Sequence, residues 1–181
     1  ASTALSLRQL RARCRFERGE VQEGVSDLAH VLQIHPSLVE PHLQISSMLF
    51  YSLGDTERGL AQIRKCLHSD PDSKPCKTLF RREKALSKVI DKVSSLIDSR
   101  QFNSATKLLV GTNAEDDLGL LNDLKADIAA AKVSHIIHPS SPDTLYASLI
   151  ERTCECYREM NSPRKAAPYC TEALTLNPSS L

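Results

Sequence analysis

Large aromatic side chains are scarce in this sequence. Its 181 residues include no tryptophan, and aromatic residues make up only 4% of the total. Leucine, alanine and serine are plentiful instead. Because strands are enriched in aromatic residues, this composition suits closely packed helices better than a β-sandwich.

Charge of one sign and long apolar runs are missing as well. The 23 basic and 22 acidic residues leave a net charge of +1, and no basic run predicts a nucleic-acid interface. The apolar stretches are far shorter than the roughly 20 residues that span a bilayer. No targeting signal is visible at the N-terminus. Since Leu5 already lies in a helical pattern, we expect a piece of a longer repeat array.

The motifs of common enzyme classes are also absent. The sequence contains no glycine-rich phosphate loop, no Gly-x-Ser-x-Gly elbow and no paired histidine and carboxylate spacing. We therefore expect no catalytic residues and no cofactor, and an enzyme is the weakest hypothesis.

What the sequence does contain is an internal repeat. Gly19 and Gly54 lie 35 residues apart, and so do Pro36 and Pro71. Each repeat has an amphipathic helix, a turn with glycine and an acidic residue, and a second amphipathic helix. This is the layout of a tetratricopeptide repeat, whose period is about 34 residues. We predict an all-α fold, a right-handed superhelical solenoid of helix-turn-helix repeats.

The repeat register divides the chain further. Arg100 replaces the glycine of the third turn, and the next turn in register falls at Asn161, so the third step contains extra residues. We expect these to form an added helix, at about 115–133, and a loop rich in proline and serine. Repeat units are predicted at 1–36, 37–71, 72–112 (with a long first helix) and 143–181, with the inserted helix and loop at 113–142.

Six cysteines raise the question of redox state. A helical hairpin brings Cys66 and Cys76 within disulfide reach, and Cys154 and Cys170 face each other across another hairpin. For each pair two alternatives stay open, a disulfide or two free thiols, because buried cysteines also fill small core positions. A metal site is not expected, since no Cys-x-x-Cys accompanies these residues. Cys14 and Cys156 have no evident partner and are predicted to be core thiols.

Several segments resemble the DnaJ homolog subfamily C member 3 family of endoplasmic-reticulum co-chaperones. The similarity covers nearly the whole chain in order, and the cysteine placement is its most specific part. The segments that carry it are 10–14, 19–28, 45–55, 64–76 and 151–156 leading to Cys170. The insertion around 115–141 departs from the family and suggests a divergent branch of fungal type.

The resemblance implies a location in the lumen of the endoplasmic reticulum and disulfides Cys66 to Cys76 and Cys154 to Cys170. It also implies that the repeats bind unfolded or misfolded clients, which a J domain delivers to the seventy-kilodalton chaperone BiP during the unfolded protein response. The J domain acts through a His-Pro-Asp motif. This sequence has only His35-Pro36-Ser37 and His138-Pro139-Ser140, so we expect no stimulation of BiP by this chain alone.

The first helices of such repeats line a concave groove. Counting back from the turns predicts a client-binding groove formed by Gln9, Arg13, Phe16, Gln44, Met48 and Tyr51. Methionine and aromatic side chains suit promiscuous binding, although Phe16 could instead pack against a neighbouring helix.

One alternative to a client-binding function remains open, a cytosolic or other scaffold that holds one specific folded protein or peptide. A clamp for a peptide carboxylate would need lysine and asparagine in the groove, where Gln9, Arg13, Gln44 and Met48 stand instead. A second copy of the chain is a further candidate partner, because the ends of a truncated solenoid expose apolar surface through which copies could associate.

Overall fold

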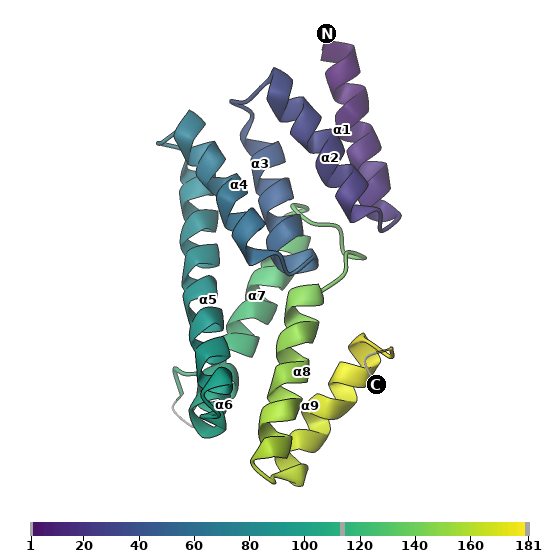
Figure 1. Cartoon of the computed structure of the whole chain (residues 1–181). Coiled ribbons are helices and arrows are strands. Elements are labelled where there is room, and N and C mark those ends of the chain that lie inside the picture. The colour runs from purple at the N-terminus through teal and green to yellow at the C-terminus, as the bar shows by residue number, and fades with distance from the viewer. Residues whose placement is uncertain (1, 113–114, 180–181) are drawn as a thin grey trace. The chain divides into compact units, whose positions relative to one another are not determined.

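The chain folds into helices joined by turns and, at residues 134–143, by a longer irregular segment (Figure 1). The structure, a computed structural model, describes residues 2–112 and 115–179, and no strand occurs among them. The helices are α1 (Ser2–Glu17), α2 (Val21–Ile34), α3 (Val39–Ser47), the π-helix η1 (Met48–Ser52), α4 (Thr56–Ser69), α5 (Lys74–Asp98), α6 (Phe102–Val110), α7 (Gly119–Val133), α8 (Thr144–Glu159) and α9 (Pro163–Leu176). No helix in these ranges is long and apolar enough to cross a membrane.

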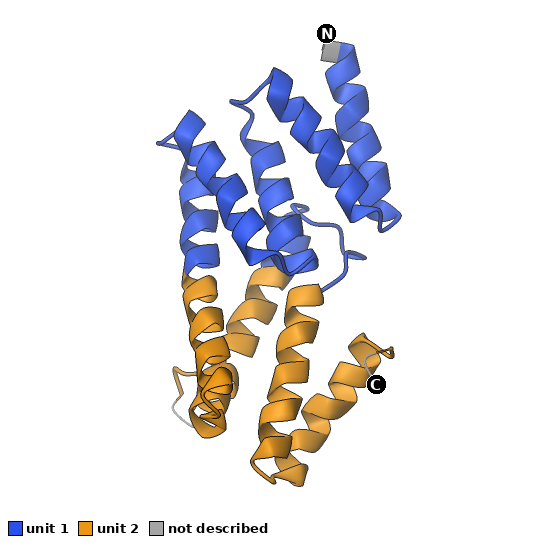
Figure 2. Ribbon diagram, viewed as in Figure 1, with its two compact units in different colours: residues 1–84, 129–143 blue, residues 85–128, 144–181 orange. Residues whose placement is uncertain are grey.

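The contacts divide the chain into two compact units (Figure 2). Unit 1 comprises residues 1–84 and 129–143, and unit 2 comprises residues 85–128 and 144–181. Helices α5 and α7 contribute residues to both units. The predicted repeat limits at residues 1, 113 and 181 lie outside the described residues, and the division into repeats stays a prediction.

Left-handed backbone marks the turns inside the helical hairpins. Gly19 and Gly54 have φ angles of 78° and 72°, and Arg100 and Asn161, at the next two turns of the sequence register, have 58° and 53°. The residue that follows three of these turns donates its N–H to a carbonyl five residues earlier, as in Gln101 to Leu96. This bond closes the helix end, since the last carbonyls have no partner within the helix.

The second hairpin differs by one residue. The N–H of Asp55 reaches six residues back, to the carbonyl of Leu49, because the π-helix η1 inserts one extra residue before Gly54. This insertion accounts for a spacing of 35 residues where the usual period is about 34.

Close contacts between paired helices depend on glycine. A Cβ atom at Gly24 of α2 would collide with the ring of Phe16 on α1. At Gly59 of α4 it would lie 2.8 Å from the Cβ of Phe50. The two phenylalanines are 34 residues apart although the glycines are 35 apart, so η1 shifts the register of the preceding helix by one residue.

Candidate functional site

Four of the six predicted groove residues line one pocket in unit 1. They are Gln9, Arg13 and Phe16 on α1 and Gln44 on α3. The pocket has a volume of about 1000 Å³, and residues 134–139 form its opposite wall. Two carboxylates, Glu17 and Glu40, also line it. The pocket therefore offers amide, cationic, anionic and apolar groups, a mixture that suits a peptide better than a small charged ion.

The periodicity of α1 places these side chains. Gln9 and Arg13 are four residues apart and share one face of the helix. Ala12 and Phe16, on the neighbouring face, are buried against α2, where the absent side chain of Gly24 leaves room for the ring. Phe16 thus packs against α2 with most of its surface, as the alternative prediction had it, and contributes its remaining surface to the pocket.

A buried carboxylate attaches α1 to α2. Asp27 of α2 accepts two hydrogen bonds from Arg11, at 3.0 and 2.6 Å, and one from Arg15 at 2.8 Å. The hydrogen bond to Asp27 raises the pKa of Arg11 above its ordinary value. Arg11 and Arg15 thus bind α2, whereas Arg13 lines the pocket.

Met48 and Tyr51 were predicted to form part of an exposed groove, and the premise that they are exposed was wrong. Met48 is 0% exposed and Tyr51 is 1% exposed. The register was counted back from Gly54 without the extra residue of η1, which turns these side chains away from the expected face. The hydroxyl of Ser141, 93 residues later in the chain, lies 3.8 Å from the sulfur of Met48. As groove residues they remain an untested prediction that burial disfavours.

The segment after the inserted helix contains pocket residues that sequence reasoning missed. Ile137 is 1% exposed, and His135 and Ile136 line the pocket. Lys132 pairs with Asp143 at 3.1 Å and joins the two ends of this segment. The adjacent Ile136 and Ile137 could have predicted that this segment packs against the core, because two isoleucines in a row are seldom both exposed.

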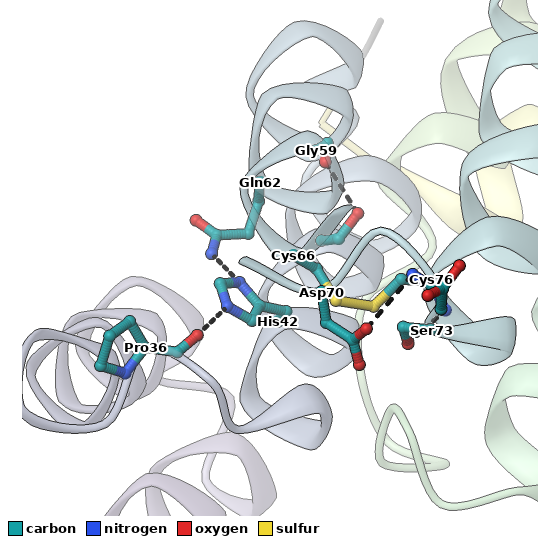
Figure 3. Close-up of a disulfide and its surroundings, with 10 residues drawn as sticks. Pro36, His42, Gly59, Gln62, Cys66, Asp70, Ser73 and Cys76 are labelled. Atoms are coloured by element: carbon teal, nitrogen blue, oxygen red, sulfur yellow. Dashed lines mark hydrogen bonds between the residues drawn. A yellow bond between two sulfur atoms is a disulfide. The ribbon is translucent and has the colours of Figure 1, made fainter. Parts of the chain in front are cut away.

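The first predicted disulfide is present in the structure. Cys66 at the end of α4 and Cys76 at the start of α5 are bonded, with an S–S distance of 1.97 Å (Figure 3). Both residues are fully buried and pack with Ile63. The bond therefore joins the two helices inside the apolar core.

The second pair, Cys154 on α8 and Cys170 on α9, is bonded as well, at 1.94 Å. Both residues are partly exposed. Burial raises the pKa of the free thiol of Cys156 to about 11, so this core thiol stays protonated at neutral pH. Cys14 is exposed, and the prediction that it is a core thiol was wrong, because it lies on the face of α1 that points away from α2.

The described residues contain no group of three or more side chains arranged to hold a metal ion. The chemistry that the pocket offers is recognition through hydrogen bonds, charge and apolar contact.

Comparison with known proteins shows what this chain is similar to. No protein-family model matches the chain. A tetratricopeptide repeat and J domain-containing co-chaperone, DNJ1, from Fusarium oxysporum f. sp. lycopersici is 44% identical over 99% of this chain and 34% of its own length. DnaJ homolog subfamily C member 3 from Homo sapiens is 29% identical over 97% of this chain and 30% of its own length. The chain is thus homologous to one part of these tetratricopeptide repeat co-chaperones.

A solved structure supports the same assignment. The tetratricopeptide repeat domain of P58(IPK) matches this chain with a TM-score of 0.71 and 27% identity, over 97% of this chain and 42% of that one. The predicted resemblance and the predicted tetratricopeptide fold are thereby confirmed. The chain spans about a third of the length of the co-chaperones that it matches.

Proposed function

We propose that this chain is the client-binding repeat segment of a co-chaperone in the lumen of the endoplasmic reticulum. The pocket that Gln9, Arg13, Phe16 and Gln44 line is the observation that carries the proposal. Its amide groups suit the backbone of an extended peptide, and its apolar surface suits the side chains that a folded protein would bury.

The two disulfides support the lumenal location. Disulfides persist in oxidising compartments such as the endoplasmic reticulum and are rare in the cytosol. The Fusarium relative is named as a J domain-containing co-chaperone, and we propose that such a J domain passes the client to BiP. A cytosolic scaffold would not need either bond, so non-reducing mass spectrometry of protein made in the secretory pathway separates the two functions.

Client binding is tested by suppression of aggregation of a chemically denatured protein. The test variant is Gln9→Glu with Gln44→Glu, which places two further carboxylates beside Glu17 and Glu40 in the pocket. We expect the wild-type chain to suppress aggregation and this variant to need several times more protein for the same effect, because apolar clients avoid concentrated charge.

Gln22→Glu is the matched control. Gln22 is exposed on α2 and does not line the pocket, so this variant should behave like wild type. Equal activity of the double variant and wild type would show that clients bind elsewhere. Substitutions at Met48 or Tyr51 would test stability instead, because both residues are buried.

A further inference from the structure

A second pocket in unit 1 has a different character. It has a volume of about 640 Å³ and is lined by residues of α2 and α4 and by His42. Two of the lining side chains, Arg64 and Lys65, are cationic, and both are exposed, as is His68. None of the described residues that line it is an aspartate or a glutamate. The excess of positive charge therefore has no counterpart within the pocket itself.

A second basic contact extends this surface to α5. The ring of Phe80 has Arg64 of α4 on one side, with 5.6 Å from guanidinium carbon to ring centroid, and Lys84 of α5 at 5.5 Å. Both distances are within the range of a cation–π contact. Neither Arg64 nor Lys84 forms an ion pair with a carboxylate in the part of the chain that the structure describes. The ring of Phe80 thus contacts two cations, Arg64 and Lys84, that repel each other.

The support beneath these cations is rigid. Phe80 packs against the buried cluster that contains the Cys66–Cys76 disulfide, and this bond joins α4 to α5. Figure 3 shows the bond between the two helices. The basic side chains are therefore displayed from a covalently closed hairpin, which lowers the entropy lost when they bind a ligand.

Two polar side chains of the pocket wall, His42 and Gln62, are already engaged in hydrogen bonds. A ring nitrogen of His42, Nε2, lies 3.0 Å from the carbonyl oxygen of Pro36, and the other, Nδ1, lies 2.9 Å from Nε2 of Gln62 (Figure 3). Since a carbonyl only accepts, His42 carries its proton on Nε2 and accepts from Gln62 at Nδ1. A ligand would find its polar partners among Arg64, Lys65, His68 and Lys84.

We propose that this surface, the basic face formed by Arg64, Lys65, His68 and Lys84 around Phe80, binds an acidic extended segment of a partner protein. Charge complementarity argues for carboxylates, since the face has four basic groups and no acidic lining residue. The pocket is also lined by Leu32 and Pro36, which can accept an apolar side chain next to an acidic one. A phosphate ion has no such group, and a flat lipid surface could not enter the pocket.

The test uses a fluorescently labelled peptide of alternating glutamate and leucine, with a glutamine and leucine peptide as the uncharged reference. Fluorescence anisotropy should show binding of the acidic peptide that weakens as salt is added. The variant Arg64→Gln with Lys84→Gln should bind about three to ten times more weakly, the loss expected for two exposed charge contacts. Lys107→Gln with Arg158→Gln removes the same charge from unit 2 and should bind like wild type.

Two results of the peptide assay would overturn the proposal. One is an equal loss in both double variants, which would mean that only net charge matters. The other is equal binding of the acidic and uncharged peptides. Binding of phosphatidylserine vesicles or RNA without binding of the acidic peptide would also reject it in favour of those ligands.

Phe80→Leu tests whether the face is organised by the ring. Leucine keeps an apolar side chain against the disulfide cluster but removes the aromatic face that holds both cations. We expect weaker peptide binding with a melting temperature close to that of wild type. Unchanged binding would contradict the role assigned to the ring. The pocket variants at Gln9 and Gln44 should leave binding of the acidic peptide unaltered, so this proposal and client binding fail independently.

Discussion

Glu83 of α5 is a charged residue type in a fully buried position. Its carboxyl oxygens both lie 2.8 Å from the hydroxyl of Ser46, which itself lies 2.7 Å from the carbonyl oxygen of Gly59. A serine hydroxyl has one hydrogen to donate. If Ser46 donates to Gly59, the carboxyl group must donate to Ser46 and is therefore protonated.

The net shift of the pKa of Glu83 is in the direction that favours a protonated carboxyl group. Burial raises this pKa from 4.5 to about 8, and the hydrogen bond with Ser46 acts in the opposite direction. The folded state thus retains a proton that the unfolded chain releases near pH 4.5. Stability from this group is complete below that pH and decreases as the pH rises towards 8, by up to about 1.4 kcal/mol per pH unit.

We predict that Glu83→Gln removes this pH dependence. Glutamine can donate to Ser46 without carrying a charge, so the variant should melt at a higher temperature than wild type near pH 8, and the difference should shrink towards pH 4.5. Melting curves followed by circular dichroism across this range measure the effect. Glu57→Gln, at an exposed position of α4, is the control. Parallel curves for Glu83→Gln and wild type would contradict a protonated Glu83.

At the scale of the element, the helix hairpins depend on two glycines whose neighbours differ. A Cβ at Gly59 would lie 3.1 Å from the backbone nitrogen of Phe50 and from the carbonyl oxygen of Ser46. At Gly24 the nearest atoms belong only to the ring of Phe16. Backbone atoms of a helix cannot move singly, whereas a ring can tilt.

Gly59→Ala is therefore predicted to destabilise the protein more than Gly24→Ala. Overpacking costs about 1–3 kcal/mol, and the better helix propensity of alanine offsets about 1 kcal/mol of it. We expect a net loss of about 1–2 kcal/mol for Gly59→Ala. Midpoints of urea unfolding compare the two variants directly. A larger loss at Gly24 would mean that the ring of Phe16 is the less adaptable neighbour.

The segment 134–143 is an element without regular structure that still contributes to the core of unit 1. Ile137→Ala should cost about 2–5 kcal/mol, because it removes a buried side chain and leaves a cavity. Val133→Ala, at a position that is 79% exposed, provides the control and should change stability little. Urea unfolding of both variants tests this. Similar losses in the two would show that the segment is not packed against the helices in solution.

At the scale of the whole molecule, each compact unit contains one disulfide. Cys66–Cys76 closes a hairpin in unit 1, and Cys154–Cys170 closes one in unit 2. The first bond is fully buried and the second is partly exposed. Access of a thiolate to the sulfur atoms limits the rate of exchange, so the two units should respond differently to reduction.

We predict that Cys154–Cys170 is reduced first when a thiol reductant is added to the folded protein. Alkylation followed by mass spectrometry identifies the order. Replacing both residues by serine should cost about 3 kcal/mol and raise hydrogen exchange in α8 and α9. Cys14→Ser, at an exposed free thiol, should change neither measurement. Earlier reduction of Cys66–Cys76 would show that the hairpin of α4 and α5 opens more readily than its burial indicates.

Much of this architecture was predictable from local patterns. The turns at Gly19 and Gly54 follow from glycine beside an acidic residue, and the same left-handed backbone recurs at Arg100 and Asn161. The groove was predicted only in part. Gln9 and Gln44 do line a pocket. The predicted register was wrong at Met48, because the π-helix adds one residue that the local sequence pattern did not predict.

The sequence by itself determined the helices, their turns and the tetratricopeptide fold, because amphipathic period and turn chemistry act over a few neighbouring residues. It also indicated the cysteine pairs, since each pair lies on one hairpin. Only the tertiary structure decided which groove residues are accessible and that Glu83 is held as a neutral acid. Those outcomes depend on contacts such as Ser141 with Met48 and Glu83 with Ser46, which join residues far apart in the chain.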